Sequence, residues 1–498
     1  MTKDSESKES KNSKPGITIK KDDNFSEWYN QVILEQGAQL CDLRYGVQGF
    51  VVYRPWGYKL IKKLYDLLEE ALENDNHEPF LFPVVIPEEN LKKEEEHAGF
   101  TPEVFWVTEA GNQKIEKKLA LRPTGETQLY PMYSLWIRSH KDLPFKKYQS
   151  RIMCYRNDMA TRPFIRGREF CFFESHDVFQ SHQDALSQIK TDMHIMDDVV
   201  WKKLFVPFTF FQRPKWDKFL GANDTYASDT LLPDGKRLQI SSTHDLGQNF
   251  AKVFNVTFID EDSKTKYGYQ TCFGPGIIRI IAGIIAIHGD DKGLILPSSI
   301  TPVEAVIVPI FFTDKKEENK KIDAYCKELQ KKVSKAVYDD ALDETPGFKY
   351  NKWELKGVPL RLEIGPKEVQ EKTVTIARRA DRKKITVKQA ELSHAIQEQL
   401  KENDLAIQKK AEEYFKNNTK ETKEFSDLKK MLAKHKGFIK VPWCSTEMDG
   451  KDCAEKLKAE TQGATVCGEP YNQKEKASGK CIICQKTAKH LVYIAKTY

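Results

Sequence analysis

Met153-Cys154-Tyr155-Arg156 is followed along the chain by Arg162-Pro163-Phe164-Ile165-Arg166-Gly167-Arg168-Glu169-Phe170, and this stretch decides the fold. The apolar residues before Arg156 predict the end of a buried strand, and Arg166 comes ten residues later. This spacing is typical of two antiparallel strands joined by a loop. Both guanidinium groups would then face one bound polyanion, because the planar arginine fork binds phosphate oxygens in pairs and stays charged.

Neighbouring segments extend this interpretation to a sheet. Residues 57–73 have apolar side chains at helical spacing and are followed by the apolar run 80–86, so we expect a helix and then a buried strand. Residues 226–232 and 236–242 are strand-like and are joined by a turn that contains Asp-Gly, which is a good hairpin signal. We therefore predict a mostly antiparallel sheet rather than a doubly wound parallel one.

The composition is that of a folded protein with several domains. The chain has 498 residues, of which 40% are hydrophobic and 31% charged, and a chain of this length is expected to form about two to four domains. The most apolar window, residues 280–287, is far shorter than the ~18 residues of a membrane span, so we expect no membrane crossing. The net charge of +6 is mild, and a polyanion would therefore meet a local patch rather than a basic body.

We divide the sequence into four segments. Residues 1–23 are rich in Ser, Lys and acidic residues and lack a signal-peptide core, which predicts a disordered tail on a cytoplasmic protein. Residues 24–298 form the largest predicted domain, and residues 299–395 alternate strand-like and helix-like runs, which predicts a small α/β domain. Residues 396–498 comprise a Lys- and Glu-rich stretch, interpreted as a solvated helical connector, and a cysteine-rich end.

Five of the ten cysteines lie in this cysteine-rich end, at Cys444, Cys453, Cys467, Cys481 and Cys484. Because the chain has no secretion signal, such clustering favours metal binding over disulfides. Cys481 and Cys484 have the spacing of zinc ligands. Free thiols without a metal are the alternative interpretation.

Side chains would have to hold any nucleotide, because the chain contains neither G-x-x-x-x-G-K-[ST] nor a strand-linked G-x-G-x-x-G. Arg279 opens the apolar run 280–287, so it is either buried against a carboxylate or facing a ligand. Thr124 and Glu126 could together hold an ammonium group. Alternatively, Thr124 and Thr127 cap a helix whose first turn contains Glu126. The residues alone leave both questions open.

These segments together resemble the class II aminoacyl-tRNA synthetases. Phe80-Leu81-Phe82-Pro83 is similar to motif 1, residues 156–169 to motif 2, and the turn before Arg279 to motif 3. A more specific series resembles the prolyl-tRNA synthetases of the eukaryotic and archaeal type. That series, which covers nearly everything after residue 23, comprises residues 121–127, Trp136-Ile137-Arg138, Thr243-His244, His288-Gly289-Asp290, residues 353–366 and the chain end at Tyr498. Gly125 stands where serine is common in this family, and Phe172 stands where tryptophan is common.

The resemblance implies a multidomain α/β fold. Its parts would be a mostly antiparallel class II sheet flanked by helices, a smaller α/β anticodon-binding domain at 299–395 and a C-terminal α/β zinc-binding domain. The zinc ligands would be Cys444, Cys453, Cys481 and Cys484, although Cys467 could replace one of them. Tyr498 matches a family pattern in which the chain end reaches back toward the active site.

The resemblance also implies where the substrates bind. The catalytic residues would be Arg156 on the α-phosphate of ATP, and Arg166 and Arg279 on the outer phosphates, together with Mg²⁺. The ATP site would be formed by Arg156, Arg166, Glu169, Gln239 and Arg279. The proline site would be formed by Thr124, Glu126, Arg156, Phe172, His176, Ser242 and His244. No strong protein base is needed for activation, because the carboxylate of proline is already a nucleophile, so catalysis would rest on positioning and charge stabilisation.

The anticodon residues implied by the resemblance are Glu354, Arg361, Lys367 and Glu368. Carboxylates beside basic groups suit the recognition of base edges, whereas the residues alone would equally fit a solvated strand edge.

A bacterial-type editing domain is not expected between motifs 2 and 3. His176 and Tyr269 are separated by 92 residues, largely spanned by a helix and the hairpin. A pocket for the pyrrolidine ring rejects smaller amino acids poorly, since a missing methylene is worth only about 1–3 kcal/mol. We therefore expect measurable activation of alanine or cysteine that this chain does not clear.

The expected function is thus the ATP-dependent formation of prolyl-tRNA in translation. The partners would be ATP, L-proline and proline tRNA, and the enzyme would be a cytoplasmic homodimer. A tRNA-binding protein without catalysis and a class II enzyme of another specificity are the alternatives. The intact arginines argue against the first, and the Thr-x-Glu pattern and Tyr498 argue against the second.

Overall fold

The computed structural model describes residues 16–98, 103–434, 436–472 and 475–498, and it divides into two compact units. The first unit contains the described residues up to Asp42, then Tyr53–Gly57 and Gly289–Asp404. The second contains Leu43–Val52, Tyr58–His288 and the described part of Leu405–Tyr498. No helix among the described residues is both long and apolar enough to cross a membrane.

The predicted disordered tail is only partly described. Residues 1–15 lie outside the described residues. In the segment that follows, the backbone N–H of Thr18 donates to Gln31 Oε1 at 2.8 Å, and that of Lys21 donates to Asp291 Oδ1 at 2.9 Å. At Thr18 and Lys21 the chain is therefore held against the first unit, and this part of the predicted tail is ordered.

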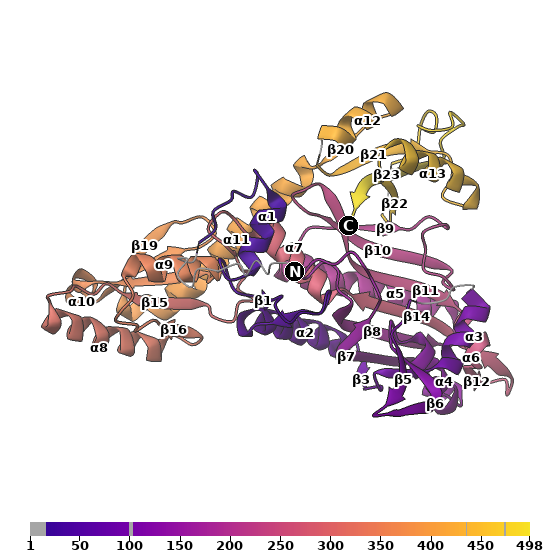
Figure 1. Ribbon diagram of the computed structural model, residues 1–498, viewed down its shortest axis with the longest axis horizontal. Helices are drawn as coiled ribbons and strands as arrows, with labels where there is room; N and C mark the ends of the chain where they lie inside the picture. The colour runs from indigo at the N-terminus through magenta and orange to yellow at the C-terminus, as the bar shows by residue number, and fades with distance from the viewer. Residues whose placement is uncertain (1–15, 99–102, 435, 473–474) are drawn as a thin grey trace, which may run out of the picture. The chain divides into compact units, whose positions relative to one another are not determined.

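The second unit is built on one large sheet, whose central strands β10, β11, β14 and β8 lie side by side (Figure 1). From one edge to the other, the strands are β20 (Thr419–Glu421), β21 (Phe438–Trp443), β23 (His490–Thr497), β22 (Thr465–Pro470), β9 (Thr209–Gln212), β10 (Asp224–Leu231), β11 (Lys236–Gly247), β14 (Tyr269–Pro275), β8 (Glu169–Phe179), β7 (Phe145–Tyr155) and β3 (Glu78–Pro79). The central pairings from β9 to β7 are all antiparallel, which confirms the predicted sheet type.

Two predicted elements of this sheet are confirmed closely. β7 and β8 are the antiparallel pair expected on either side of the arginine-rich loop, and Tyr155 lies opposite Glu169 where they meet that loop. β10 and β11 form the predicted hairpin. Gly235 in its turn has φ +87°, a conformation that L side chains rarely adopt, which explains the Asp-Gly sequence.

Helices cover the sheet of the second unit. Buried Ala185, Ile189 and Met193 pack α5 against β11 and β14. The predicted helix at 57–73 is α2, which runs from Pro55 to Asn74. The other helices that lie mainly in this unit are α3 (Glu88–Ala98), α4 (Glu126–Trp136), η1 (His140–Asp142), α5 (His182–Met196), the π-helical η2 (Asp197–Lys203), α6 (Asn249–Phe254), α7 (Ile277–His288), α12 (Phe425–Lys434), η4 (Met448–Gly450) and α13 (Lys451–Glu460). Two small sheets join β4 (Val85–Pro87), β6 (Gln113–Leu121) and β5 (Trp106–Ala110), and β12 (Thr257–Ile259) and β13 (Thr265–Tyr267).

The predicted buried strand at 80–86 is wrong. Only the short strands β3 and β4 lie at the ends of this run, and Leu81 is 78% exposed. Phe80 and Phe82 instead pack in an aromatic cluster, with ring centroids 5.0 Å apart and Phe82 at 5.9 Å from Trp136. The apolar run thus serves local aromatic packing and an exposed surface rather than the sheet.

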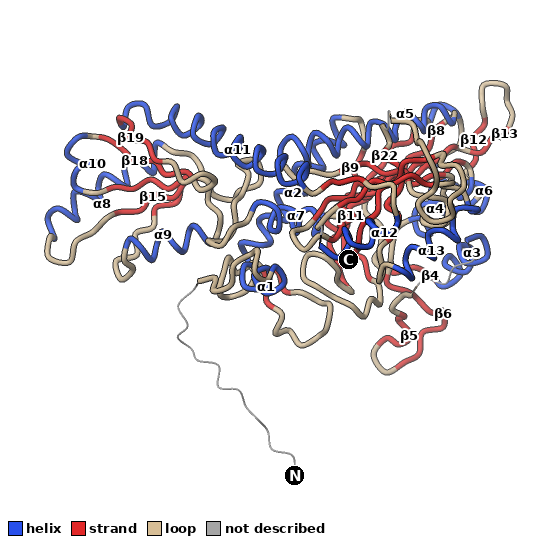
Figure 2. Tube along the Cα trace, turned by 90° about the horizontal axis from the view of Figure 1, so that it is seen from above, coloured by secondary structure: helices blue, strands red, loops and turns tan. Residues whose placement is uncertain are grey.

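The first unit contains the predicted small α/β domain. Its five-stranded sheet has helices around it (Figure 2). The strands in order are β16 (Ala336–Tyr338), β15 (Ala305–Pro309), β17 (Leu360–Ile364), β18 (Thr373–Arg378) and β19 (Lys384–Lys388). The other elements that begin in or lie within this unit are α1 (Phe25–Ile33), β1 (Cys41–Asp42), α8 (Lys316–Lys332), α9 (Pro346–Leu355), α10 (Pro366–Glu371), η3 (Gln389–Glu391) and α11 (Leu392–Asn417), and β2 spans Val52–Tyr53.

The predicted solvated connector corresponds to α11, and part of it is packed. Leu392, Ile396 and Leu400 belong to the buried core of the five-stranded sheet, whereas Leu405 is 56% exposed. The charged residues therefore cover only the outer face of a helix that also has an apolar face.

Candidate active site

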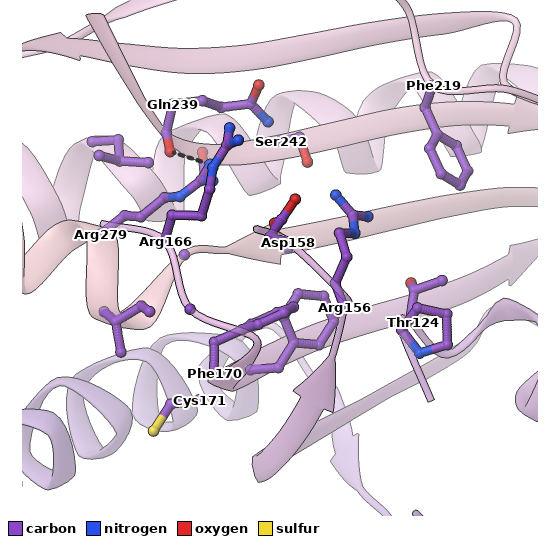
Figure 3. Close-up of a pocket in the computed structure, with 18 of the residues that line it drawn as sticks. Thr124, Arg156, Asp158, Arg166, Phe170, Cys171, Phe219, Gln239, Ser242 and Arg279 are labelled. Carbon is purple, nitrogen blue, oxygen red and sulfur yellow. Dashed lines mark hydrogen bonds between the residues drawn. The ribbon is translucent and has the colours of Figure 1, made fainter. Parts of the chain in front are cut away.

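Most of the residues predicted to bind ATP and proline meet in one cavity of about 270 Å³ in the second unit. It lies where the β7–β8 loop, the start of α4, β11 and the β14–α7 turn converge (Figure 3). The predicted residues that line it are Thr124, Glu126, Arg156, Arg166, Phe172, Gln239, Ser242, His244 and Arg279. In the view of Figure 3, Arg166 and Arg279 lie at one end beside Gln239, Thr124 lies at the other, and Arg156 lies between them.

Backbone carbonyls hold Arg279 at the first end. Its Nε donates to Ile165 O at 3.0 Å and its Nη1 donates to Gln239 O at 3.2 Å. Burial, with Arg166 and Arg156 nearby, lowers its pKa from 12.5 to about 10. No Asp or Glu forms an ion pair with Arg279 among the described residues. The alternative in which Arg279 is buried against a carboxylate is therefore wrong, and its role toward a ligand stays a prediction.

A tight turn presents Arg166. The N–H of Arg162 donates to Arg166 O at 2.8 Å, and the N–H of Arg166 donates back to Arg162 O at 2.9 Å. Arg166 Nη2 also donates to Tyr498 O at 3.2 Å, while the hydroxyl of Tyr498 donates to Asp234 Oδ2 at 2.6 Å. The prediction that the chain end reaches back toward the site is therefore confirmed.

Arg156 directly follows β7, and its backbone N–H donates to Arg168 O at 2.9 Å. Within the described part of the chain, its guanidinium has no hydrogen-bond or ion-pair partner. An arginine that lines a cavity without a partner leaves its donors free for an anionic ligand.

At the opposite end, Thr124 and Glu126 act as a pair. Thr124 Oγ1 donates to Glu126 Oε2 at 2.5 Å. The predicted helix N-terminus is present, but Gly125 occupies the N-cap position and no side chain caps the helix. Burial and the neighbouring Glu174 raise the pKa of Glu126. A bound cation would favour the ionised carboxylate, so this pair suits a positively charged amine.

Glu174 explains why glycine occupies position 125. A Cβ on Gly125 would lie 2.2 Å from Glu174 Oε1. The Glu174 carboxylate is held in place by Gln149, whose Nε2 donates to it at 2.5 Å, and by His176 Nε2 at 3.1 Å. Sequence patterns gave no signal for this arrangement, because it depends on contacts between separate strands.

His176 lies behind the cavity rather than in its lining. It is fully buried, and its Nδ1 is 2.9 Å from the hydroxyl of Tyr130. Burial alone would lower the pKa of His176, but Cys272 and Glu174 raise it. His176 therefore belongs to a buried polar network that supports the cavity wall.

His244 lines the cavity as a neutral imidazole. Burial and the nearby His176 lower its pKa to about 3. Its Nδ1 is 2.9 Å from Thr225 Oγ1, and Phe219 packs on the ring with centroids 4.8 Å apart. Phe219 carried no sequence signal, because it lies in an irregular loop before β10.

Glu169 is the one predicted ATP residue that does not line the cavity. It begins β8 opposite Tyr155, and the two side chains share a hydrogen bond that contributes to a raised Tyr155 pKa.

The sequence also missed a buried triad behind Gln239. Asp229 accepts from Arg213 Nη2 at 2.7 Å and from Arg237 Nη1 at 2.6 Å, and Arg213 donates on to Gln239 Oε1 at 3.0 Å.

In the first unit, two of the four predicted anticodon residues share a basic cavity of about 150 Å³. Arg361 donates to Glu354 Oε1 at 2.8 Å there, and the cavity is also lined by Trp353, Arg378, Arg379, Arg382 and Lys384. Lys367 and Glu368 lie on α10 outside it. Glu368 accepts from the N–H of Gly365 at 2.9 Å and from Thr375 at 3.1 Å. These two contacts give Glu368 a role in the packing of α10.

The four cysteines Cys444, Cys453, Cys481 and Cys484 form one group, with every Sγ within 4.8 Å of the others. Cys444 and Cys453 are 3.7 Å apart at sulfur, close to the roughly 3.8 Å between thiolates on a tetrahedral zinc ion. The donor set thus fits zinc. Cys467, the alternative ligand, is buried on β22, where its carbonyl accepts from Arg213 at 2.5 Å, and it lies outside this group.

The fold and the cavity define the class of the protein. Residues 105–288 match the model of the tRNA synthetase class II core domain (G, H, P, S and T), residues 304–399 match an anticodon binding domain, and residues 425–498 match the C-terminal domain of prolyl-tRNA synthetase. The chain is a class II aminoacyl-tRNA synthetase.

Similar proteins specify the family. The chain is 51% identical to a proline–tRNA ligase of Thermofilum pendens over 98% of this chain and all of that protein, and 41% identical to that of Pyrococcus abyssi over 96% and 98%. The solved structure of Giardia lamblia prolyl-tRNA synthetase with prolyl-adenylate superposes with a TM-score of 0.92 at 31% identity, covering 97% of this chain and all of that one. The Cryptosporidium parvum enzyme complexed with halofuginone and AMPPNP gives 0.90 at 31% identity, over 98% of each chain.

The chain belongs to the proline–tRNA ligase family. Its reaction is the ATP-dependent ligation of proline to tRNA, and this confirms the function expected from the sequence.

Proposed function

We propose that the two ends of the cavity divide the substrates of this reaction. Arg166 and Arg279 take the outer phosphates of ATP, Arg156 takes the α-phosphate, and Thr124 with Glu126 takes the imino group of proline. The observation that carries the proposal is that three arginines, none with an Asp or Glu partner among the described residues, line one cavity opposite a buried carboxylate. Guanidinium groups in a cavity with no acidic side chain beside them carry positive charge that an anionic ligand would neutralise.

Activation then needs positioning more than a base. A carboxylate oxygen of proline attacks the α-phosphorus, pyrophosphate leaves, and prolyl-adenylate forms. A ribose hydroxyl of the tRNA end next attacks the prolyl carbonyl, and AMP leaves. Arg156 would stabilise the charge that develops on the α-phosphoryl oxygens, and Mg²⁺ would neutralise the leaving pyrophosphate.

The proline ring would lie among Phe172, Ser242 and neutral His244. Uncharged His244 does not repel the imino cation. His176 would act as a positioning residue, since it contacts Glu174 and Tyr130 rather than the cavity. Because the pocket excludes smaller amino acids only by lost contacts, we propose that alanine or cysteine is also activated.

Further assignments complete the proposal. Zinc bound at the four-cysteine group would be structural. Glu354 and Arg361 would contact the anticodon bases in their cavity, and Lys367 and Glu368 would contact the anticodon from α10, outside that cavity. The enzyme would be a homodimer. The enzyme would act in the cytoplasm, with the tRNA that it charges.

Two variants and a control test the division of the cavity by proline-dependent exchange of pyrophosphate into ATP. Thr124→Val should raise KM for proline about 10-fold or more with little change in KM for ATP, because it removes a hydrogen bond to a charged group worth about 1.5–3 kcal/mol. Arg156→Gln should lower kcat. The control is Arg151→Gln, which changes an arginine of β7, the strand that precedes Arg156; Arg151 pairs with Asp66 and Glu69 and does not line the cavity. Equal effects of Thr124→Val on both substrates would contradict the assignment.

A further inference from the structure

A second group of potential metal ligands lies at the amino-acid end of the cavity. Glu126, His176 and Cys272 each offer one ligand atom, and these atoms all lie within 4.8 Å of one another. The three residues are at most 6% exposed. They lie in the second unit, as does the four-cysteine group, but they share no residue with that group.

The backbone fixes two of the three ligands relative to each other. Cys272 on β14 lies directly opposite His176 on β8 in the antiparallel ladder. Cys272 Sγ is 3.8 Å from His176 Nε2. A zinc ion bound to one sulfur at about 2.3 Å and one nitrogen at about 2.0 Å with a tetrahedral angle needs a separation of roughly 3.5 Å. The pair therefore needs only a small adjustment to share one ion.

The surrounding contacts orient these ligands. The hydroxyl of Tyr130, 2.9 Å from His176 Nδ1, holds the ring so that Nε2 lies 3.8 Å from Cys272 Sγ and 3.1 Å from Glu174 Oε2. A metal ion on Nε2 would displace the contact with Glu174. Thr124 Oγ1 fixes Glu126 through its Oε2. Hydrogen-bond partners of the ligand residues orient the ligands and tune metal sites in proteins.

The fourth position would face the cavity. Glu126 and Cys272 both line it, whereas His176 closes the group from behind. Three protein ligands and one open position are typical of zinc sites that exchange a water or a substrate. A Cys, His and carboxylate set also suits a borderline-soft divalent ion such as Zn²⁺ or Co²⁺ rather than Mg²⁺.

We propose that Glu126, His176 and Cys272 form a regulatory site for Zn²⁺ whose occupation excludes proline. The ion would replace the thiol proton of Cys272 and any proton on His176 Nε2, both released to solvent, and it would engage the carboxylate that otherwise binds the imino group. Proline and Zn²⁺ then compete. This competition rests on the proposed position of proline, whereas the metal site itself does not.

Metal uptake by the full-length enzyme, with its four-cysteine group already loaded with zinc, tests the site. Co²⁺ is added, and the bound metal is measured by equilibrium dialysis and by the thiolate-to-cobalt absorption band. We expect about one equivalent beyond the four-cysteine group, lost in Cys272→Ser and retained in Cys154→Ser, a fully buried cysteine of β7 in the same sheet. No additional equivalent in the wild type, or an undiminished one in Cys272→Ser, would overturn the proposal.

Competition is measured on the same samples. Saturating proline should prevent Co²⁺ uptake by the wild-type enzyme, and added Zn²⁺ should raise KM for proline at least 5-fold without changing kcat. This measurement needs no variant, so a Cys272→Ser protein that fails to fold does not stop the test. Uptake that is lost in Cys272→Ser yet indifferent to proline would support the metal site and overturn the proposed position of proline.

Discussion

Replacing Arg279 by methionine should leave the ligand-free enzyme as stable as the wild type, or make it more stable, while abolishing much of its affinity for ATP. The pKa of Arg279 is lowered from 12.5 to about 10, mainly by burial and then by Arg166 and Arg156. A depressed pKa of a base means that its charged form destabilises the folded state at every pH below about 10, and that stability rises only between about 10 and 12.5.

The size of this effect follows from the structure. One pKa unit corresponds to about 1.36 kcal/mol, so the charged Arg279 destabilises the folded state by at most about 3 kcal/mol. The actual cost is smaller, because the side chain is only half-buried and solvent screens its charge. Methionine removes that cost but also removes the hydrogen bonds to Ile165 O and Gln239 O, each worth about 0.5–1.5 kcal/mol. The two effects nearly cancel, which leaves a net change of about 0–2 kcal/mol in favour of the variant.

ATP binding should respond in the opposite direction. Truncating one partner of a buried charged pair costs about 2–4 kcal/mol, or roughly 30- to 1,000-fold in affinity. The assay is thermal unfolding of both proteins at pH 7.5 with and without ATP and Mg²⁺. We expect a wild-type Tm that rises on ATP addition and an Arg279→Met Tm that is at least as high without ATP and does not rise with it. An Arg279→Met protein that melts several degrees lower without ATP would refute the reasoning, because Arg279 would then be a structural residue.

Three further outcomes are expected. Asp229→Ala leaves Arg213 and Arg237 buried without a carboxylate, so it should destabilise the protein by about 3–5 kcal/mol and lower Tm, and an unchanged Tm would contradict this role. Burial and Asp177 raise the pKa of Asp192 to about 7. The stability that the protonated carboxyl contributes is therefore complete below about pH 4 and is lost as the pH rises to about 7. Asp192→Asn should flatten the pH dependence of Tm in this window and raise Tm at pH 8. Cys484→Ser, or removal of metal by a chelator, should reduce bound zinc by about one equivalent and lower Tm, as read by metal analysis and melting, whereas full retention of zinc would contradict the four-cysteine assignment.

Local sequence patterns predicted the parts of the fold that depend on local chemistry. The Asp-Gly turn between β10 and β11 and the helical spacing in α2 are properties of neighbouring residues, and both were confirmed. The run 80–86 failed because hydrophobicity alone does not distinguish a sheet core from an aromatic cluster with an exposed Leu81. The boundaries at residues 298 and 395 stay predictions.

The candidate site was likewise predicted in part. The family motifs predicted that Arg156, Arg166 and Arg279 bind one substrate, and the three arginines line one cavity. Glu174 and Cys272 could not be found in this way, because their importance comes from strand register: Cys272 is opposite His176, and Glu174 fills the space left by glycine at position 125. Contacts between distant segments of the chain are set by the sheet and are not encoded in any short pattern.

The central claim, that this cavity activates proline with ATP, is tested most directly by amino-acid-dependent exchange of pyrophosphate into ATP with each of the standard amino acids. Proline should support the fastest exchange by far, alanine and cysteine should support weaker but measurable exchange, and Thr124→Val should reduce the proline signal. Exchange with no amino acid, or faster exchange with an amino acid other than proline, would contradict the account.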